Sequence, residues 1–181
     1  PGLVRSHNED AFLAERPIFL VADGMGGHER GEVASASAVQ QFAALAGRPW
    51  VFAQDLRERA TAAASVIAGL AAGRHAPGTT VAGVGLTHEW GRPSWLPFNL
   101  GDSRVYLLRG GELAQISVDH SRRQEMLDAG ADPATVTVGR NVITRALGAG
   151  IGGIPRVDVW RMPALPGDRV LICSDGLSGE L

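Results

Sequence analysis

The spacing of hydrophobic residues changes once along the chain, and this change limits the folds that the chain can adopt. Between residues 31 and 73, apolar side chains recur at intervals of three and four, which predicts two helices that end near Gly47 and Gly73. Beyond residue 78 the apolar residues fall in short β-rich runs, which predicts strands. A strand, a helix pair and then consecutive antiparallel strands indicate an α+β domain with sheets and helices in separate layers.

The predicted strands are short and bounded by turn-forming residues. Each is a run of apolar and β-branched side chains next to Gly, Pro, Asn or Asp. The pair Gly110-Gly111 between two of these runs is typical of a two-residue hairpin turn. The runs cover residues 17–22, 79–87, 95–100, 104–109, 112–118, 157–161 and 169–173.

Two pairs of polar residues have the spacing of helix-capping boxes. Asp55 with Glu58 predicts the start of the second helix, and Ser121 with Gln124 predicts the start of a short third one. Residues 132–153 are rich in glycine and weakly patterned, so this segment is expected to form an exposed loop or flap.

Length, charge and cysteine content exclude several classes of protein. A chain of 181 residues fits one domain. The formal net charge of −2 gives no basic field that would attract nucleic acid or an anionic membrane. Cys173 is the single cysteine, so no disulfide can form within the chain, and a reducing compartment, the cytoplasm, is expected.

The chain contains no lysine, since all 17 basic residues are arginine. This excludes the lysine of P-loop nucleotide hydrolases, the catalytic lysine of protein kinases and every Schiff-base mechanism. No apolar run approaches the roughly 20 residues of a membrane-spanning helix, and no signal segment opens the sequence.

Acidic residues recur next to predicted strands. Asp23 and Asp175 each follow an apolar strand and precede a glycine. Asp102 follows another apolar segment, and the Glu9-Asp10 pair comes just before the first apolar segment of the chain. Carboxylates that converge on one point repel each other unless cations hold them, and oxygen ligands favour Mg²⁺ or Mn²⁺ over Zn²⁺. A single Asp-Gly pair after a strand is more typical of an ordinary turn, so only the recurrence of the pattern favours a metal site.

Several short stretches resemble the metal-dependent protein serine/threonine phosphatases of the PPM or PP2C type in their bacterial form, and they occur in the same order as in that family. Each stretch alone is modest, but together they extend over nearly the whole chain. They are residues 2–12, 21–28, 31–35, 78–80, 100–106, 119–121, 143–148 and 167–177.

This resemblance implies two packed antiparallel β-sheets flanked by helix pairs, with a two-metal site at one end of the sandwich. It implies that Asp23 bridges two Mn²⁺ or Mg²⁺ ions, that Gly24 offers its carbonyl, and that Asp175 ligates one ion. Asp102 matches the position associated with a third, weaker metal.

The resemblance also implies catalytic roles near the start of the chain. Glu9 and Asp10 would hold metal-bound waters, and Arg5 would bind the substrate phosphate, for which a guanidinium is well suited. Met25 stands where many eukaryotic members have a histidine, so water is expected to protonate the leaving group. None of the five histidines is assigned a role.

The resemblance further implies that residues 1–181 are one phosphatase domain cut at both ends. A first strand before Pro1 is expected, as are final strands and another metal-binding aspartate after Leu181. Residues 119–150 correspond to the variable flap of the family.

The first functional hypothesis is a cytoplasmic, monomeric phosphatase that removes phosphate from phosphoserine and phosphothreonine in proteins and so reverses a bacterial kinase. A specialised form would act on anti-sigma-factor antagonists. The alternative is a regulatory module or pseudophosphatase that binds phosphoproteins without turnover. The sequence does not indicate the protein substrate or the kinase.

Overall fold

The computed structural model describes residues 8–26, 30–70, 76–139 and 142–179. Its elements in chain order are β1 (Asp10–Glu15), β2 (Ile18–Met25), α1 (Arg30–Ala43), α2 (Ala53–Gly69), β3 (Gly78–Thr79), β4 (Val81–Glu89), β5 (Arg92–Leu100), β6 (Arg104–Arg109), β7 (Glu112–Gln115), α3 (Arg122–Asp128), β8 (Leu147–Gly148), β9 (Asp158–Val159), β10 (Met162–Pro163), β11 (Arg169–Cys173) and α4 (Asp175–Ser178). None of the described helices is long and apolar enough to cross a membrane.

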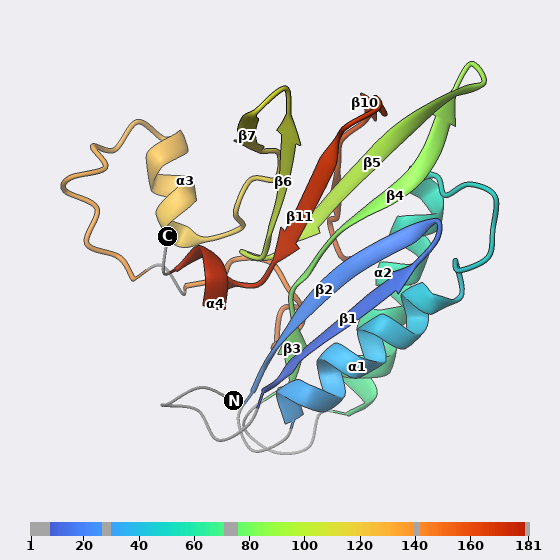
Figure 1. Cartoon of the computed structure of the whole chain (residues 1–181). Coiled ribbons are helices and arrows are strands. Elements are labelled where there is room, and N and C mark those ends of the chain that lie inside the picture. Colours follow the sequence, from blue (N-terminus) through green and yellow to red (C-terminus); the bar gives the residue numbers. More distant parts are fainter. Residues whose placement is uncertain (1–7, 27–29, 71–75, 140–141, 180–181) are drawn as a thin grey trace.

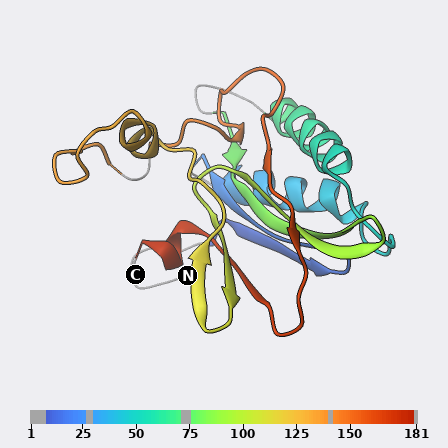
Figure 2. The same ribbon diagram turned by 90° about the horizontal axis from the view of Figure 1, so that it is seen from above.

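The described strands form two antiparallel sheets, which confirms the α+β prediction. The larger sheet has the order β10-β5-β4-β2-β3-β8, with β1 paired to β2 and β9 paired to β5; the smaller has the order β11-β6-β7. Helices α1 and α2 cover one face of the larger sheet, and the smaller sheet lies on the other side (Figures 1 and 2). The short helices α3 and α4 lie beside the smaller sheet, away from this helix pair (Figure 1).

The main core lies between the larger sheet and the helix pair. Strand β2 alternates buried and half-buried residues, as a strand with one covered face must. Small residues such as Ala34 and Ala38 let α1 approach the sheet closely, and the ring of Phe42 stacks on Phe98 with 5.6 Å between centroids. Gly83 makes room for this pair, since a Cβ there would lie 2.5 Å from the Phe98 ring.

Two of the predicted turns and caps are confirmed. Gly110 and Gly111 join β6 to β7 with φ of 61° and 90°, values that glycine adopts without strain. The Ser121 hydroxyl accepts a hydrogen bond from the Gln124 N–H at 3.2 Å and so caps α3. Of the predicted strand at residues 157–161, only Asp158–Val159 forms a strand, β9, while β10 follows beyond it and pairs with another part of β5.

The predicted start of the second helix is wrong by one turn. Helix α2 begins at Ala53 after the N-cap Phe52, and the Asp55 carboxylate accepts a hydrogen bond from the Phe52 N–H at 2.8 Å. Asp55 therefore occupies the third helical position, and Glu58 accepts from Gln54 instead. The spacing Asp55-Glu58 imitates a capping box because both residues also favour the first turns of a helix.

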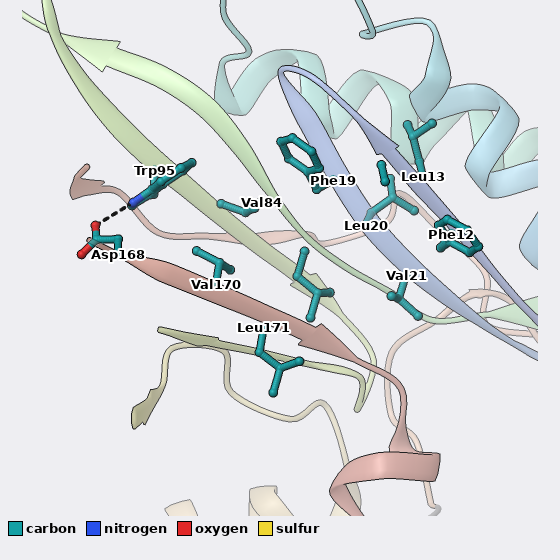
Figure 3. Close-up of a pocket in the computed structure, with 12 residues that line it drawn as sticks. Phe12, Leu13, Phe19, Leu20, Val21, Val84, Trp95, Asp168, Val170 and Leu171 are labelled. Atoms are coloured by element: carbon teal, nitrogen blue, oxygen red, sulfur yellow. Dashed lines mark hydrogen bonds between the residues drawn. The ribbon is translucent and has the colours of Figure 1, made fainter. Parts of the chain in front are cut away.

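An apolar groove of about 470 Å³ separates the two sheets along one side (Figure 3). Phe12, Phe19 and Val84 from the larger sheet face Val170 of β11 across it, and the Trp95 indole N–H donates to Asp168 at 2.8 Å at one end. Among the described strands, β1 pairs only with β2 and β11 only with β6, so two unpaired sheet edges border this groove.

Truncation of Phe42 tests where the core lies. We expect Phe42→Ala to lower the free energy of unfolding by about 3–5 kcal/mol, because it leaves a cavity under Phe98. The matched change Phe12→Ala removes a ring that is 73% exposed, so its effect should stay below about 1 kcal/mol. Urea denaturation measures both, and equal losses would contradict this description of the core.

Candidate functional site

The β1–β2 hairpin brings three acidic residues to one end of the larger sheet. Asp10 and Asp23 are directly opposite in the antiparallel register. The Gly24 N–H donates to the Glu9 carbonyl at 3.2 Å, which continues the pairing by one residue. Asp10 and Asp23 thus lie side by side, although 13 positions separate them in the sequence, because a tight hairpin joins their strands.

Two further carboxylates come from other elements. Asp102 lies in the turn after β5 of the larger sheet, and Asp175 is the first residue of α4, directly after β11 of the smaller sheet. The Ser174 hydroxyl donates to Asp10 at 3.0 Å, a hydrogen bond that joins the two sheets at this end.

These elements enclose a pocket of about 330 Å³ whose walls are mainly polar. Asp23 and Asp175, from separate sheets, both line it, as does Asp102. Among the described residues, its lining is Glu9, Asp23, Gly24, Met25, Gly26, Thr80, Asp102, Ile143 and Asp175. The carboxylates that the sequence singled out are therefore brought together, with the exceptions that follow.

Arg5, one of the predicted site residues, lies outside the described residues. Asp10, another, is described but is not part of this lining. Asp10 is exposed and acts on the pocket through its charge rather than by lining it. In the described part of the chain, no three Asp, Glu, His or Cys side chains are arranged so that they could hold one metal ion together. The ligand roles of Asp23, Gly24, Asp102 and Asp175 thus stay predictions.

The pocket concentrates negative charge in a partly buried place. Burial raises the pKa of Asp23 to about 8, and the charges of Asp10 and Asp175 add to this rise. Burial also raises the pKa of Asp102 to about 6, with the charge of Asp175 as the next cause. Either protons or cations are needed to relieve this repulsion.

The donor atoms in the pocket suit a hard cation. In the described part of the lining they are carboxylate oxygens and backbone carbonyls near Gly24, with no thiolate or imidazole among them. Mg²⁺ and Mn²⁺ prefer such oxygen ligands. The donor set therefore fits the predicted metals, although the side chains would have to rotate to share an ion.

Helix α1 packs so closely against Glu9 and the end of β2 that Gly24 and Gly31 have no space for a side chain. A Cβ on Gly24 would lie 2.2 Å from the Gly31 carbonyl oxygen, and a Cβ on Gly31 would lie 2.8 Å from the Glu9 carboxyl carbon. The Ser35 hydroxyl donates to the Glu9 carbonyl at 2.6 Å. These contacts fix Glu9 and Gly24 against the first turns of the helix.

The turn that carries Asp102 is held by the segment that begins the predicted flap. The Gly101 N–H donates to His120 Nδ1 at 3.0 Å, and the Gly101 carbonyl accepts from the His120 N–H at 2.8 Å. His120 Nδ1 is therefore unprotonated, and Nε2 can donate to Asp158 at 2.9 Å. Burial lowers the pKa of His120, so its neutral form is favoured.

Sequence reasoning missed several residues that shape this site. All of them lie in stretches that resemble the family, but none was assigned a role: they are Gly31, Thr80, Ser103 and His120. The available signal was weak: a polar residue at the start or end of an apolar strand. All four are buried in the structure.

Comparison with known proteins gives consistent matches. The family model for protein phosphatase 2C matches residues 4–181. The serine/threonine protein phosphatase PstP of Mycobacterium tuberculosis is 35% identical in an alignment of 192 positions, which covers 98% of this chain and 35% of that protein. The serine/threonine phosphatase stp of Listeria innocua is 32% identical, over 98% of this chain and 75% of that protein. The chain thus spans about a third of the length of its mycobacterial relative.

Solved structures agree with the sequence matches. The crystal structure of the Mycobacterium tuberculosis phosphatase PstP/Ppp superposes with a TM-score of 0.87 at 35% identity, covering 99% of this chain and 77% of that one. A second structure of the PstP catalytic domain, in complex with two manganese ions, has a TM-score of 0.79 at 34% identity, covering 99% and 76%.

Neutralising Asp23 should stabilise the metal-free protein. Because its folded-state pKa lies far above the ordinary aspartate value of 3.8, the folded form holds a proton that the unfolded chain releases, and stability falls as pH rises from about 4 to 8. Asp23→Asn removes this loss, so we expect its melting temperature in EDTA at pH 8 to exceed that of the wild type by a few degrees, which corresponds to about 1 kcal/mol.

The matched control is Asp128→Asn on α3, outside the pocket, which should melt as the wild type does. The difference between Asp23→Asn and the wild type should shrink toward pH 5. Differential scanning calorimetry across this range measures it. A lower melting temperature for Asp23→Asn at pH 8 would show that the pocket does not impose the expected repulsion.

Proposed function

Because the chain belongs to the protein phosphatase 2C family, we propose that it catalyses the metal-dependent hydrolysis of phosphoserine and phosphothreonine in proteins. One observation carries this proposal: carboxylates from both sheets line a single pocket at the end of the sandwich. Protein kinases produce the phosphorylated side chains that such an enzyme consumes. A manganese-bound structural relative supports Mn²⁺ or Mg²⁺ as the cofactor.

The chain's own residues would divide the work as follows. Asp23, the Gly24 carbonyl and Asp175 would hold two cations, and Asp102 a third, weaker one. Bound divalent cations supply positive charge to the phosphate and lower the pKa of an attacking water. Glu9 and Asp10 would orient water molecules at the pocket's edge, and the Arg5 guanidinium would bind the phosphate with its planar fork.

We also propose that residues 119–150 act as a flap beside the pocket within one phosphatase domain. Ile143 from this segment lines the pocket, and a β-bridge joins it to Ser121 at the flap's start. The surface of a flap in this position would contact the protein part of a substrate. A monomeric state and a cytoplasmic location stay predictions from the sequence.

The test of catalysis uses the full-length protein. With Mn²⁺ it should hydrolyse p-nitrophenyl phosphate and a phosphothreonine peptide, and EDTA should abolish turnover. We expect Asp175→Asn to lower kcat by on the order of 100-fold or more, because it removes a charged ligand from the pocket. Glu58→Gln on α2, at an exposed residue outside the pocket and the flap, is the control and should retain wild-type kcat.

A folded, Mn²⁺-saturated protein that hydrolyses neither substrate would contradict the proposal. If that protein still binds the phosphopeptide, the alternative of a regulatory, non-hydrolysing module gains support. Turnover restricted to a phosphorylated anti-sigma-factor antagonist would identify the specialised form of the enzyme.

A further inference from the structure

Two buried hydroxyl groups connect the strand that carries Asp23 with the turn that carries Asp102. Thr80 lies between β3 and β4, and Ser103 directly follows Asp102. Their hydroxyl oxygens are 2.7 Å apart, and both residues are at most 1% exposed. A hydrogen bond in so dry a place holds its partners closely, because breaking it would leave a buried polar group unpaired.

The Thr80 hydroxyl also takes the place of the backbone carbonyl that would normally accept a hydrogen bond from the Asp23 N–H. In a regular antiparallel pair each residue donates its N–H to the other's carbonyl. Here the Thr80 N–H donates to the Asp23 carbonyl at 2.9 Å, but the Asp23 N–H donates to the Thr80 hydroxyl at 3.2 Å. Thr79 adds its hydroxyl to the same carbonyl at 2.9 Å. The Asp23 backbone is therefore clamped from one side by two threonines.

The other side of Thr80 touches both neighbours of Asp102. A Cβ on Gly101 would lie 2.6 Å from the Thr80 Cβ, so the backbone of that turn is in contact with the threonine side chain. Ser103, on the far side of Asp102, receives or donates the hydroxyl hydrogen bond. A displacement of Thr80 would thus move Asp23 and Asp102 together.

We propose that Thr80 and Ser103 are positioning residues that fix the distance between Asp23 and Asp102 for cation binding. This inference rests on the proposed metal-dependent function of the pocket. Neither hydroxyl has to touch a cation or the substrate. The two hydroxyl groups would instead keep the backbones of Asp23 and Asp102 at a fixed separation. Without them, the two carboxylates would move apart because they repel each other.

The test compares Mn²⁺ affinity, measured by isothermal titration calorimetry, among variants of the full-length protein. Thr80→Val keeps the shape of the side chain but removes the hydroxyl, and we expect it to weaken Mn²⁺ binding by roughly 10-fold or more. Thr80→Ser retains the hydroxyl and should restore most of the affinity. Ser103→Ala should weaken binding in the same direction.

A double variant separates the hydroxyl pair from independent effects. Since Thr80→Val already breaks the link to Ser103, adding Ser103→Ala should cause little further loss of affinity. The matched control is Thr87→Val on β4, which removes another fully buried threonine hydroxyl, one that has no hydrogen-bond partner among the described residues. It should bind Mn²⁺ as the wild type does.

The outcomes distinguish this inference from the function on which it rests. If Thr80→Val melts at a lower temperature but binds Mn²⁺ with wild-type affinity, the hydroxyl pair is merely structural and the inference is overturned, while the proposed function stands. Failure of Thr80→Ser to restore affinity would overturn it too. A wild-type protein that binds no Mn²⁺ would refute the proposed function and the inference together.

Discussion

Repulsion among carboxylates in one partly buried pocket is the constraint that the rest of the site has to satisfy. Asp23, Asp102 and Asp175 come from different elements, and burial together with neighbouring charge raises the pKa of the first two. Such groups separate unless the surrounding backbone prevents it. The hydrogen bonds and close contacts around the pocket matter because they keep the carboxylates from moving apart without adding positive charge.

Contacts to the backbone on three sides of the pocket keep the carboxylates from moving apart. Helix α1 contacts Gly24 through Gly31, two threonines clamp the Asp23 backbone, and His120 holds the turn before Asp102. The described residues of the lining include no basic side chain, so none of these contacts adds positive charge to that part of the pocket. The described donor atoms are rich in oxygen, which suits a hard cation.

The sequence was sufficient for the parts of the molecule that depend on local pattern. Strand β6, its glycine hairpin and the Ser121 cap were predicted because propensity and turn chemistry act over a few residues. The start of α2 was misjudged because Asp55 suits two positions of a first turn equally well. The Thr80 hydroxyl contacts were not predicted because they join residues 57 and 23 positions apart, and nothing in the local pattern marks such pairs.

The hydrogen bond from Ser174 to Asp10 has a mechanical consequence, because it lies where the two sheets meet. One wall of the pocket belongs to each sheet, so sliding of one layer over the other would distort the pocket before either layer lost its own pairing. An apolar groove separates the same layers along one side and offers little directional resistance to such sliding (Figure 3). A displacement of one layer relative to the other would therefore change the shape of the pocket even if every strand kept its partners.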